Sequence, residues 1–539
     1  MFTRKPHIFL VIMAGVFSLI LGAGCSAPAQ PGGVTPDRSA TGPSGKAVIA
    51  LSAQTTATVD PALQGGASDF MNLEPLFNRL TETPKDSTLI RGPGVAEKWS
   101  IGPDGKTVEF QIRKGVRFHN GDELTPEDVV FSIQRVQKIG PPNNKIYFAR
   151  FIESVQASGD SVVFKLKEPD WTVLSGLSSS SYSVVPKKYI EKVGDDGFLK
   201  APVGSGPFKF VSWSKQESLE LEAVDYEHFL WQPGVKQLRY VIVAEETTRL
   251  AMLKTGEADL AQVSVTSLKA IEADKSLRPI RVPNVNGLVL FMFGQVDPSN
   301  PLSKLEVRQA LSLAIDREAI SKGIYQGYAR PLTASLWNPE APDLPEWGKT
   351  SIKQDMNKAA DLLSKAGFPG GKGLKITLHN YEYPTAPLWT QVAPVIRSQW
   401  EKLGIQVELR QWEWASWSPV ARTGKLDPVS VGTHLANNVG EQGAIGQIAR
   451  GGLYSIAAGT EVGAYPQLAD WSDEFLRELD PAKRAKLLTN ILVFDRDNVV
   501  RLPVIAQDGL WAAGPRLLEY TPRPGNISSG NTWTIKVKS

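Results

Sequence analysis

The stretch between residues 94 and 136 constrains the fold more than any other part of the chain, because a turn, a strand and a helix start follow one another there. Pro103-Asp104-Gly105 predicts a turn, since proline presets φ and glycine accepts positive φ. Apolar and polar residues then alternate over 107–112, which is the period of a half-buried strand. Thr125 followed by Pro126 predicts an N-cap and the first position of a helix. The chain therefore mixes strands and helices at short range.

The same stretch carries many residues at the fixed spacing of a known pattern, namely Ala96, Glu97, Trp99, Asp104, Gly105, Gly115, Val116, Phe118, His119, Gly121, Thr125, Glu127, Asp128, Val129, Phe131 and Ser132. Further matches lie at 202–210, 225–226, 247–259 and 307–318. Together they resemble the peptide/nickel/oligopeptide class of extracytoplasmic solute-binding proteins (family 5, cluster C), which deliver ligand to ABC importers. The resemblance implies an α/β, two-lobed, type II periplasmic-binding-protein-like fold with an extra peripheral subdomain. It implies a binding protein without cofactor or catalysis.

Charge and cysteine content narrow the partners. The chain has 539 residues and 21% charged residues, so we expect a soluble protein of two or more domains. A formal net charge of +3 is too close to neutrality to favour nucleic acid. One cysteine permits no internal disulfide and no Cys-rich zinc site.

The histidines do not predict a metal site. None of the five is at i,i+3 or i,i+4 spacing from another; they are His7, His119, His228, His379 and His434. Some nickel-class relatives bind a chelated metal through few protein ligands, so His434 stays open as a candidate. No metal and no cofactor is otherwise expected.

The N-terminus has the features of a bacterial lipoprotein signal peptide over 1–25. Arg4 and Lys5 precede a mainly apolar stretch that is shorter than the roughly 20 residues of a membrane span. Leu21 lies four residues before Cys25, where the usual box places leucine three before. We expect Cys25 to be lipidated and the protein to be held by a lipid anchor in the periplasm or at the outer face of the cell membrane. An ordinary secretory signal is the alternative.

The rest of the chain divides into a tether and two lobes. Residues 26–46 are rich in Ala, Pro, Gly, Ser and Thr, which is typical of a flexible tether. We predict the first lobe over 47–288, with a peripheral subdomain at about 82–200, the second lobe over 289–494, and a return to the first lobe over 495–539. Strand–helix–strand order around 374–409 predicts a parallel sheet in the second lobe. The crossing segments are expected near 288–293 and 495–504.

Open α/β sheets bind ligands beyond the carboxyl ends of their strands, so the loops that follow strands are the candidate site. Aromatic residues are dense there, and Trp412 and Trp414 share one face if their strand continues. The predicted ligand-binding residues are Gln54, Thr55, Tyr381, Tyr383, Trp412, Trp414, Thr433, His434, Asn437 and Asn438. Each aromatic residue among them could instead be core packing.

The segment 427–441 departs from the family pattern. Peptide-binding members carry an aspartate that pairs with the peptide ammonium group, and our alignment places Asn437 there. An asparagine accepts a hydrogen bond but cannot neutralise a buried ammonium group, whose unpaired burial is costly. With Thr433, His434 and Asn438 it predicts a neutral hydrogen-bonding set. Binding of a small polar solute with an apolar or ring portion is therefore favoured over ordinary peptides.

The predicted function is that of a substrate-binding lipoprotein, most simply a monomer, that captures a small solute or peptide and passes it to ABC permease subunits with their ATPases. An exported hydrolase is one alternative. Ser212–Lys215 and Lys254–Gly256 match two motifs of penicillin-binding enzymes, but Ser212 falls in a predicted strand and no Ser-Asp-Asn element accompanies them. A binding protein used for signalling is the other alternative.

Overall fold

The computed structural model describes residues 43–52, 58–64, 73–82, 92–141, 144–145, 151–171, 173–332, 350–382, 386–423, 426, 429–437, 445, 448–450, 455, 461, 463–523 and 531–538. Within these ranges, the side chains of residues 175, 284, 285, 387, 414, 415, 418, 422 and 433–437 are not described. The predicted signal peptide, Cys25 and most of the predicted tether lie outside the described residues.

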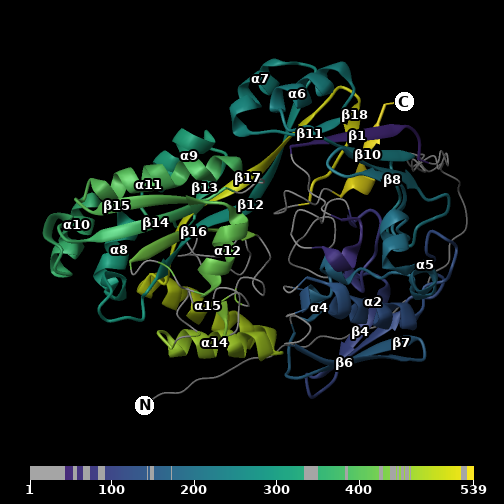
Figure 1. Ribbon diagram of the computed structural model, residues 1–539, viewed down its shortest axis with the longest axis horizontal. Helices are drawn as coiled ribbons and strands as arrows, with labels where there is room; N and C mark the ends of the chain where they lie inside the picture. The colour runs from purple at the N-terminus through teal and green to yellow at the C-terminus, as the bar shows by residue number, and fades with distance from the viewer. Residues whose placement is uncertain are drawn as a thin grey trace, which may run out of the picture. The chain divides into compact units, whose positions relative to one another are not determined.

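One large sheet runs through the molecule. In the described residues its order is β15-β14-β16-β12-β17-β11-β1-β10-β9-β8, with β13 added beside β17. Its strands are β1 (Lys46–Leu51), β8 (Phe208–Ser214), β9 (Ser218–Ala223), β10 (Gln237–Ile242), β11 (Leu260–Gln262), β12 (Arg278–Phe293), β13 (Ala329–Pro331), β14 (Lys375–Tyr381), β15 (Gln406–Trp412), β16 (Ser430–Asn437) and β17 (Arg501–Ala513). Figure 1 shows β12 and β17 running between the group of helices α8–α11 and the region of β1 and β10.

Parallel pairing occurs on both sides of these two long strands. β1 pairs in parallel with β10 and β11, whereas β14 pairs in parallel with β15 and β16. The parallel sheet predicted from the strand–helix–strand pattern of the second lobe is therefore confirmed. β12 and β17 are antiparallel to each other and join the two parts.

The prediction for the second crossing segment is wrong over its first residues. Residues 495–498 are the last turn of α15 (Pro481–Asn498), and the crossing strand itself is β17. The helix extends to these residues with Asp495 buried on its last turn, where the carboxylate pairs with Arg501 at 2.8 Å. Residues 288–293 do lie in a strand, β12, which is much longer than the predicted segment.

A separate four-stranded sheet, in the order β4-β5-β7-β6, lies within the predicted peripheral subdomain. Its strands are β4 (Ala96–Ile101), β5 (Thr107–Ile112), β6 (Ile152–Ser158) and β7 (Ser161–Leu166). The strand predicted over 107–112 is therefore confirmed. α2 (Pro126–Ile139) packs on this sheet, and Thr125 is its N-cap, with Asp128 accepting the Thr125 backbone N–H at 2.9 Å.

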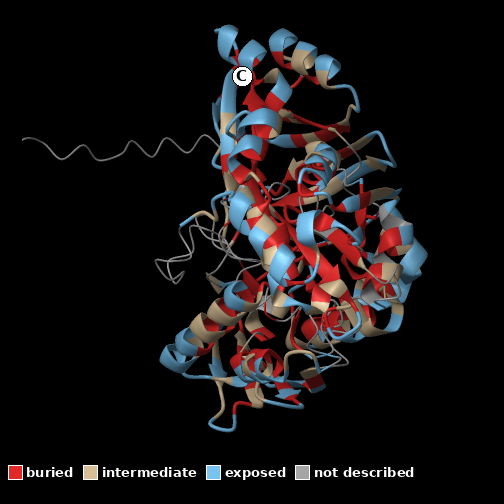
Figure 2. Ribbon diagram, turned by 90° about the vertical axis from the view of Figure 1, so that its left-hand side faces the viewer, coloured by how far each residue is buried: buried red, intermediate tan, exposed pale blue. Residues whose placement is uncertain are grey.

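The remaining helices pack on the large sheet, on one another or, in the case of α4, in the core of the four-stranded sheet. Their outer faces are exposed, whereas the strands are largely buried (Figure 2). They are α4 (Val173–Gly176), α5 (Lys187–Lys200), α6 (Glu246–Thr255), α7 (Leu268–Ala273), α8 (Leu305–Leu313), α9 (Arg317–Tyr325), α10 (Met356–Lys365), α11 (Val392–Glu401), α12 (Trp414–Thr423) and α14 (Pro466–Arg477). Two small strand pairs complete the fold: β2 (Thr81–Glu82) with β3 (Gly92–Pro93), and β18 (Leu517–Glu519) with β19 (Lys536–Val537).

Each lobe has its own apolar core. The second-lobe core gathers residues of β12, β14 and β17 with α8–α11, and includes Trp389 and Trp400. The first-lobe core gathers β1, β8–β10 and the C-terminal residues Trp533 and Ile535. Within the described part of the chain, no helix is long and apolar enough to span a bilayer.

Candidate functional site

A pocket lies beside β17 and takes its walls from both lobes. Ser52 and Gln262 stand at the carboxyl ends of β1 and β11 in the first lobe, while Tyr325 ends α9 in the second lobe. Its complete lining is Ser52, Glu246, Arg249, Gln262, Val263, Ser264, Val265, Tyr325, Tyr328, Leu388, Gln507, Asp508 and Leu510. The pocket therefore occupies the position that the strand-end rule predicts for a ligand in an open α/β sheet.

The charged groups of the pocket wall are already paired. Arg249 is buried, and it donates to the carbonyl oxygens of Gln262 at 2.8 Å and of Val243 and Ala244 at 2.7 Å. Burial lowers the pKa of Arg249 below its usual value. Glu246 accepts from the Ser264 backbone N–H at 3.0 Å and pairs with Arg249 at 3.6 Å.

Asp508, the third charged group of the wall, lies on β17. Its carboxylate is fully buried and forms an ion pair with Arg281 of β12. The wall thus offers hydroxyl, amide and already paired carboxylate oxygens rather than an isolated charge. A site of this kind suits a neutral polar ligand better than one that brings its own unpaired charge.

Amide side chains continue from the pocket across the sheet. Gln507 of the pocket is the register partner of Asn286 on β12, so the two share one face of the sheet. Asn286 is 4% exposed, and its side-chain Nδ2 has no hydrogen-bond partner among the described residues. On the other side, Asn286 is the register partner of Asn437 on β16. The residue that departs from the peptide pattern is thus two strands away from a wall residue of the pocket.

Of the predicted aromatic residues whose side chains are described, Tyr381 is buried and Trp412 is half-buried. Tyr381 is fully buried at the end of β14, with ring centroids 4.9 Å from Trp389 and 6.2 Å from Trp417. Trp412 remains half-buried, and its Nε1–H donates to Nδ1 of the buried His379 at 2.9 Å. Among the predicted aromatic residues whose side chains are described, Trp412 is the one with surface left to offer a ligand.

Trp412 and Trp414 do not share a strand face. β15 ends at Trp412, and Trp414 begins α12, so the strand on which that expectation depended stops too early. Thr433, His434 and Asn437 lie on β16, which places their backbone in the large sheet. Gln54, Thr55, Tyr383 and Asn438 lie outside the described residues.

Sequence reasoning missed the residues that line the pocket. Arg249 lies in the family match over 247–259, but neither it nor Glu246 nor Gln262 is among the predicted ligand-binding residues. A signal was present, because Glu246 and Arg249 start the helix that follows a parallel strand, and such helix starts lie at the ligand-binding edge. Gln507 and Asp508 gave no signal, because their strand returns to the first lobe from a distant part of the sequence.

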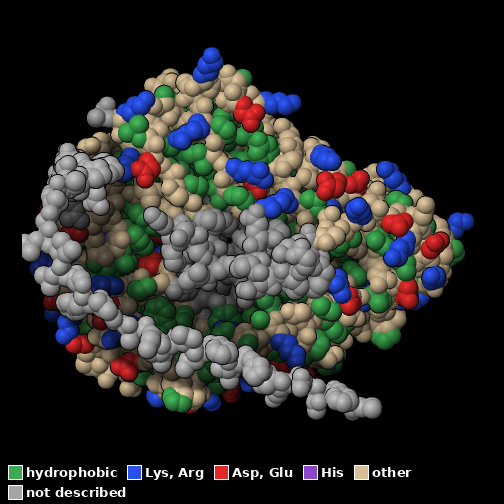
Figure 3. Space-filling model, turned by 180° about the vertical axis from the view of Figure 1, so that it is seen from behind, with side chains coloured by type: hydrophobic (Ala, Val, Ile, Leu, Met, Phe, Trp, Pro, Cys, Tyr) green, Lys and Arg blue, Asp and Glu red, His purple; other side chains and the backbone are tan. Residues whose placement is uncertain are grey.

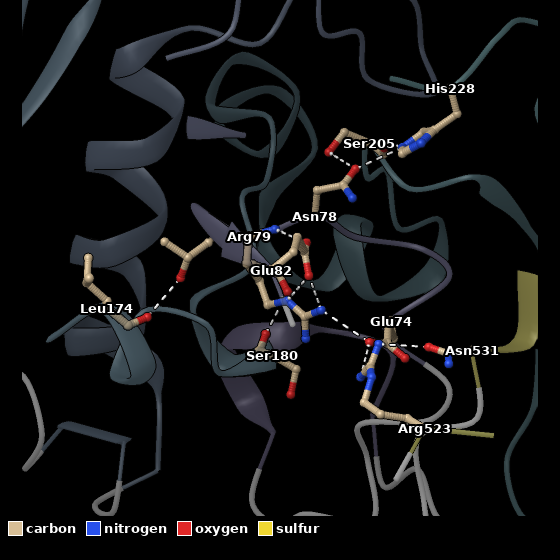
Figure 4. Close-up of polar contacts among 12 residues, drawn as sticks. Glu74, Asn78, Arg79, Glu82, Leu174, Ser180, Ser205, His228, Arg523 and Asn531 are labelled. Atoms are coloured by element: carbon tan, nitrogen blue, oxygen red, sulfur yellow. Dashed lines mark hydrogen bonds and ion pairs between the residues drawn. The ribbon is translucent and has the colours of Figure 1, made fainter. Parts of the chain in front are cut away.

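A second polar cluster is a structural element of the first lobe (Figure 4). Arg79 pairs with Glu82 and with Glu74 at 3.3 Å, and Glu74 also pairs with Arg523 at 2.7 Å. All four side chains are at most 4% exposed. Burial tends to lower the pKa of Arg79, but the two glutamates raise it above its usual value. Two positive and two negative charges compensate within the cluster, which joins residues 73–82 to the C-terminal segment.

No group of three or more potential metal ligands is found within the described residues. His379 is held by Trp412 and by the Ser430 hydroxyl at 3.2 Å. On the face drawn in Figure 3, Lys and Arg side chains are interspersed with Asp and Glu among the described residues.

Two α/β lobes, joined by two long strands and sharing a pocket, define the class of two-lobed solute-binding proteins. The model of the family "bacterial extracellular solute-binding proteins, family 5" matches residues 92–443, which is more than half of the chain. The chain belongs to this family. The family is one of extracellular solute-binding proteins, and the relatives below are named as binding proteins.

The relatives differ in what they bind. The chain is 28% identical over 495 residues to heme-binding protein A of Haemophilus influenzae, covering 85% of this chain and 86% of that protein. It is 30% identical over 385 residues to the dipeptide-binding protein of Escherichia coli, covering 66% and 70%. Its fold matches an ABC transporter-associated periplasmic binding protein from Helicobacter pylori, solved with a peptide, with a TM-score of 0.72, 20% identity and coverage of 92% and 98%.

Proposed function

We propose that this protein is the lipid-anchored substrate-binding component of an ABC importer and captures a small solute between its lobes. The observation that supports this most directly is the pocket beside β17, because its walls come from both lobes. A ligand that contacts both walls favours the closed arrangement of lobes joined by β12 and β17, which is how hinged binding proteins retain their ligands. The closed complex then delivers the solute to the permease subunits. The protein acts as a monomer in this role.

The lipid anchor is proposed from Cys25, which follows a charged and then apolar N-terminal segment. Replacing Cys25 by Ser is expected to move the protein from the membrane fraction to the soluble fraction. Metabolic labelling with a fatty acid distinguishes this proposal from an ordinary secretory signal. A wild-type protein that is soluble and unlabelled contradicts it.

We further propose that the ligand is a small polar solute with an apolar or ring portion and that ordinary peptides bind poorly. Three observations support this: the paired charges of the pocket wall, the row formed by Gln507 and Asn286 with Asn437 beside it, and the half-buried Trp412. A charge-assisted hydrogen bond contributes roughly 1.5–3 kcal/mol. Lacking the aspartate, the site should bind peptides about one to two decades more weakly than a site that has it.

Mass spectrometry of ligand carried through purification is the most direct test of the ligand class. Calorimetry against di- and tripeptides, oligosaccharides and aromatic acids then measures the preference. Asn437→Asp should raise affinity for peptides. Gln156→Glu, at an exposed position of β6 outside the pocket lining, is the control for an added carboxylate and should leave that affinity unchanged. Submicromolar binding of unmodified peptides by the wild-type protein contradicts the proposal.

The two alternatives call for different tests. Ser212 lies on β8 rather than at a helix N-terminus, so it lacks the setting that the nucleophile of penicillin-binding enzymes requires. Labelling with a fluorescent β-lactam tests the hydrolase hypothesis directly. Adjacent genes for a permease and an ATPase favour transport, and their replacement by a sensor gene favours signalling.

A further inference from the structure

A single tryptophan of the peripheral subdomain is inserted into the helical hairpin of the second lobe. Trp171 follows β7, and its Nε1–H donates to the carbonyl oxygen of Phe475, on α14, at 2.8 Å. The two rings meet edge to face, with centroids 5.6 Å apart and an interplanar angle of 76°. The guanidinium of Arg484, on α15, lies over the indole with its carbon 4.3 Å from the ring centroid. Three different interactions therefore hold one side chain.

The hairpin that receives Trp171 is part of the second lobe. α14 and α15 share an apolar cluster with Val500, which leads directly into β17. The Tyr465 hydroxyl, just before α14, donates to Gln295 Oε1 at 2.8 Å, and Gln295 Nε2 donates to the carbonyl oxygens of Met292 and Val500 at 2.9 Å. These contacts fix the hairpin to the ends of the two crossing strands. Trp171 thus connects the first lobe's subdomain to the second lobe.

The same two elements meet at the β4–β5 turn. A Cβ atom placed on Gly105 would lie 2.9 Å from a methyl group of Leu479, which follows α14. Around this contact the surface is polar, with Asp104 on one side and Arg450, Asp470 and Asp473 on the other. Arg450 already pairs with Asp473 at 2.8 Å and with Asp470 at 2.5 Å. A small apolar contact with a polar surround is suited to separating and re-forming in water.

We propose that Trp171 and the α14–α15 hairpin form an interlobe latch that holds a closed arrangement of the lobes without contacting the ligand. In Figure 1, α14 lies near the four-stranded sheet, while β12 and β17 cross elsewhere in the molecule. None of Trp171, Phe475 and Arg484 lines the pocket beside β17. The latch therefore acts on ligand affinity only through the equilibrium between open and closed lobes. This inference rests on the proposed capture between two lobes.

A latch of this kind changes populations rather than contacts. The three interactions stabilise only the closed state, and this free energy raises the closed-to-open ratio of the ligand-free protein by the corresponding factor. Affinity for a ligand that requires closure rises by the same factor, because the ligand has less closure to induce. Loss of the indole is therefore expected to lower the closed-to-open ratio about tenfold.

The test measures lobe positions in the ligand-free protein, so that an error in the proposed ligand cannot affect it. Spin labels are attached to cysteines at Glu109, on β5, and Lys486, on α15, both of which are exposed. The full chain carries Cys25→Ser, so that these are its two thiols. Pulsed electron paramagnetic resonance then gives the distance distribution for wild type, Trp171→Ala, Trp171→Phe and a control.

The matched control is Trp99→Ala, since Trp99 lies in the same subdomain and packs against Phe110 and its core. We expect the wild-type protein to show a short-distance population that represents the closed form. In Trp171→Ala the ratio of this population to the open form should be about tenfold lower, whereas Trp99→Ala should keep the wild-type ratio. Trp171→Phe keeps an aromatic ring but loses the N–H donor, so its closed-to-open ratio should lie between those of the wild type and Trp171→Ala. If Trp171→Ala does not fold by circular dichroism, Trp171→Phe decides the outcome. A wild type without a short-distance population, or Trp171 variants with the wild-type distribution, overturns the latch.

Discussion

Acid should destabilise the first lobe through one buried histidine, and the structure shows why. His228 is 3% exposed, and its Nδ1 accepts the backbone N–H groups of Leu230 at 3.2 Å and Trp231 at 3.0 Å. Its Nε2 lies 2.9 Å from the Ser205 carbonyl oxygen and 3.2 Å from Asn78 Oδ1, as Figure 4 shows, so Nε2 carries the proton. A second proton on Nδ1 would face two N–H donors. Only the neutral ring satisfies these partners.

Burial lowers the pKa of His228 to about 4, from about 6.5 in an unfolded chain. Above pH 6.5 the ring is neutral in both states, and the free energy of unfolding carries no penalty from it. As the pH falls below 6.5, the unfolded chain binds a proton that the folded chain refuses, so stability decreases until the pH reaches about 4. The difference between the two pKa values corresponds to about 3 kcal/mol over that range.

Comparison of wild type with His228→Gln isolates this contribution, because Gln does not titrate and every other group is the same. Both proteins are unfolded by urea at pH 7.5 and pH 4.5, followed by tryptophan fluorescence. Wild type should lose more stability than the variant between the two pH values, by most of the about 3 kcal/mol. His119, whose pKa burial also lowers to about 4, is present in both proteins and cancels. An imidazole resonance of His228 that titrates near pH 6.5 by NMR refutes the reasoning.

Two stability predictions follow from buried contacts in the same lobe, each measured as the melting temperature against a control. Glu74→Gln leaves Arg79 and Arg523 with one carboxylate fewer, so the free energy of unfolding should fall by about 3–5 kcal/mol. The control Glu191→Gln, at an exposed ion pair, should lower it by under about 1 kcal/mol. Equal losses in the two variants contradict the role of the buried cluster. Gly204→Ala places a Cβ 2.0 Å from the Leu76 carbonyl oxygen and should cost about 1–3 kcal/mol, whereas Gly323→Ala, in α9 with open space around it, should stabilise by up to about 1 kcal/mol.

Local patterns were enough to predict many elements. The N-cap Thr125 and the strand over 107–112 depend on neighbours in the sequence, and both are confirmed. The parallel pairing of β14 with β15 follows from a helix between two strands, which is also a local feature.

What sequence reasoning missed depends on partners far apart in the chain. Trp412 and Trp414 are two residues apart, as on one face of a strand, but β15 ends at Trp412 and α12 begins at Trp414. The pocket is lined by residues at or near β1, α6, α9 and β17, which are far apart in the sequence. The periodicity of each segment does not show which strand end will lie next to which helix. A tyrosine at position 381 is compatible with a core position and with a ligand-binding position, and only the structure shows that its side chain is buried.

The pocket and the proposed latch are both connected to the strand β17. β17 supplies Gln507 and Asp508 to the pocket, and its first residue, Arg501, pairs with Asp495 of α15 at 2.8 Å, both side chains being at most 3% exposed. The hairpin that receives Trp171 is therefore anchored to the strand that supplies Gln507 and Asp508 to the pocket wall. A ligand held by both walls and an indole held by Phe475 and Arg484 favour one and the same closed state. Since equilibria that share a state multiply, ligand selectivity can then be set in the pocket while overall affinity is set at Trp171.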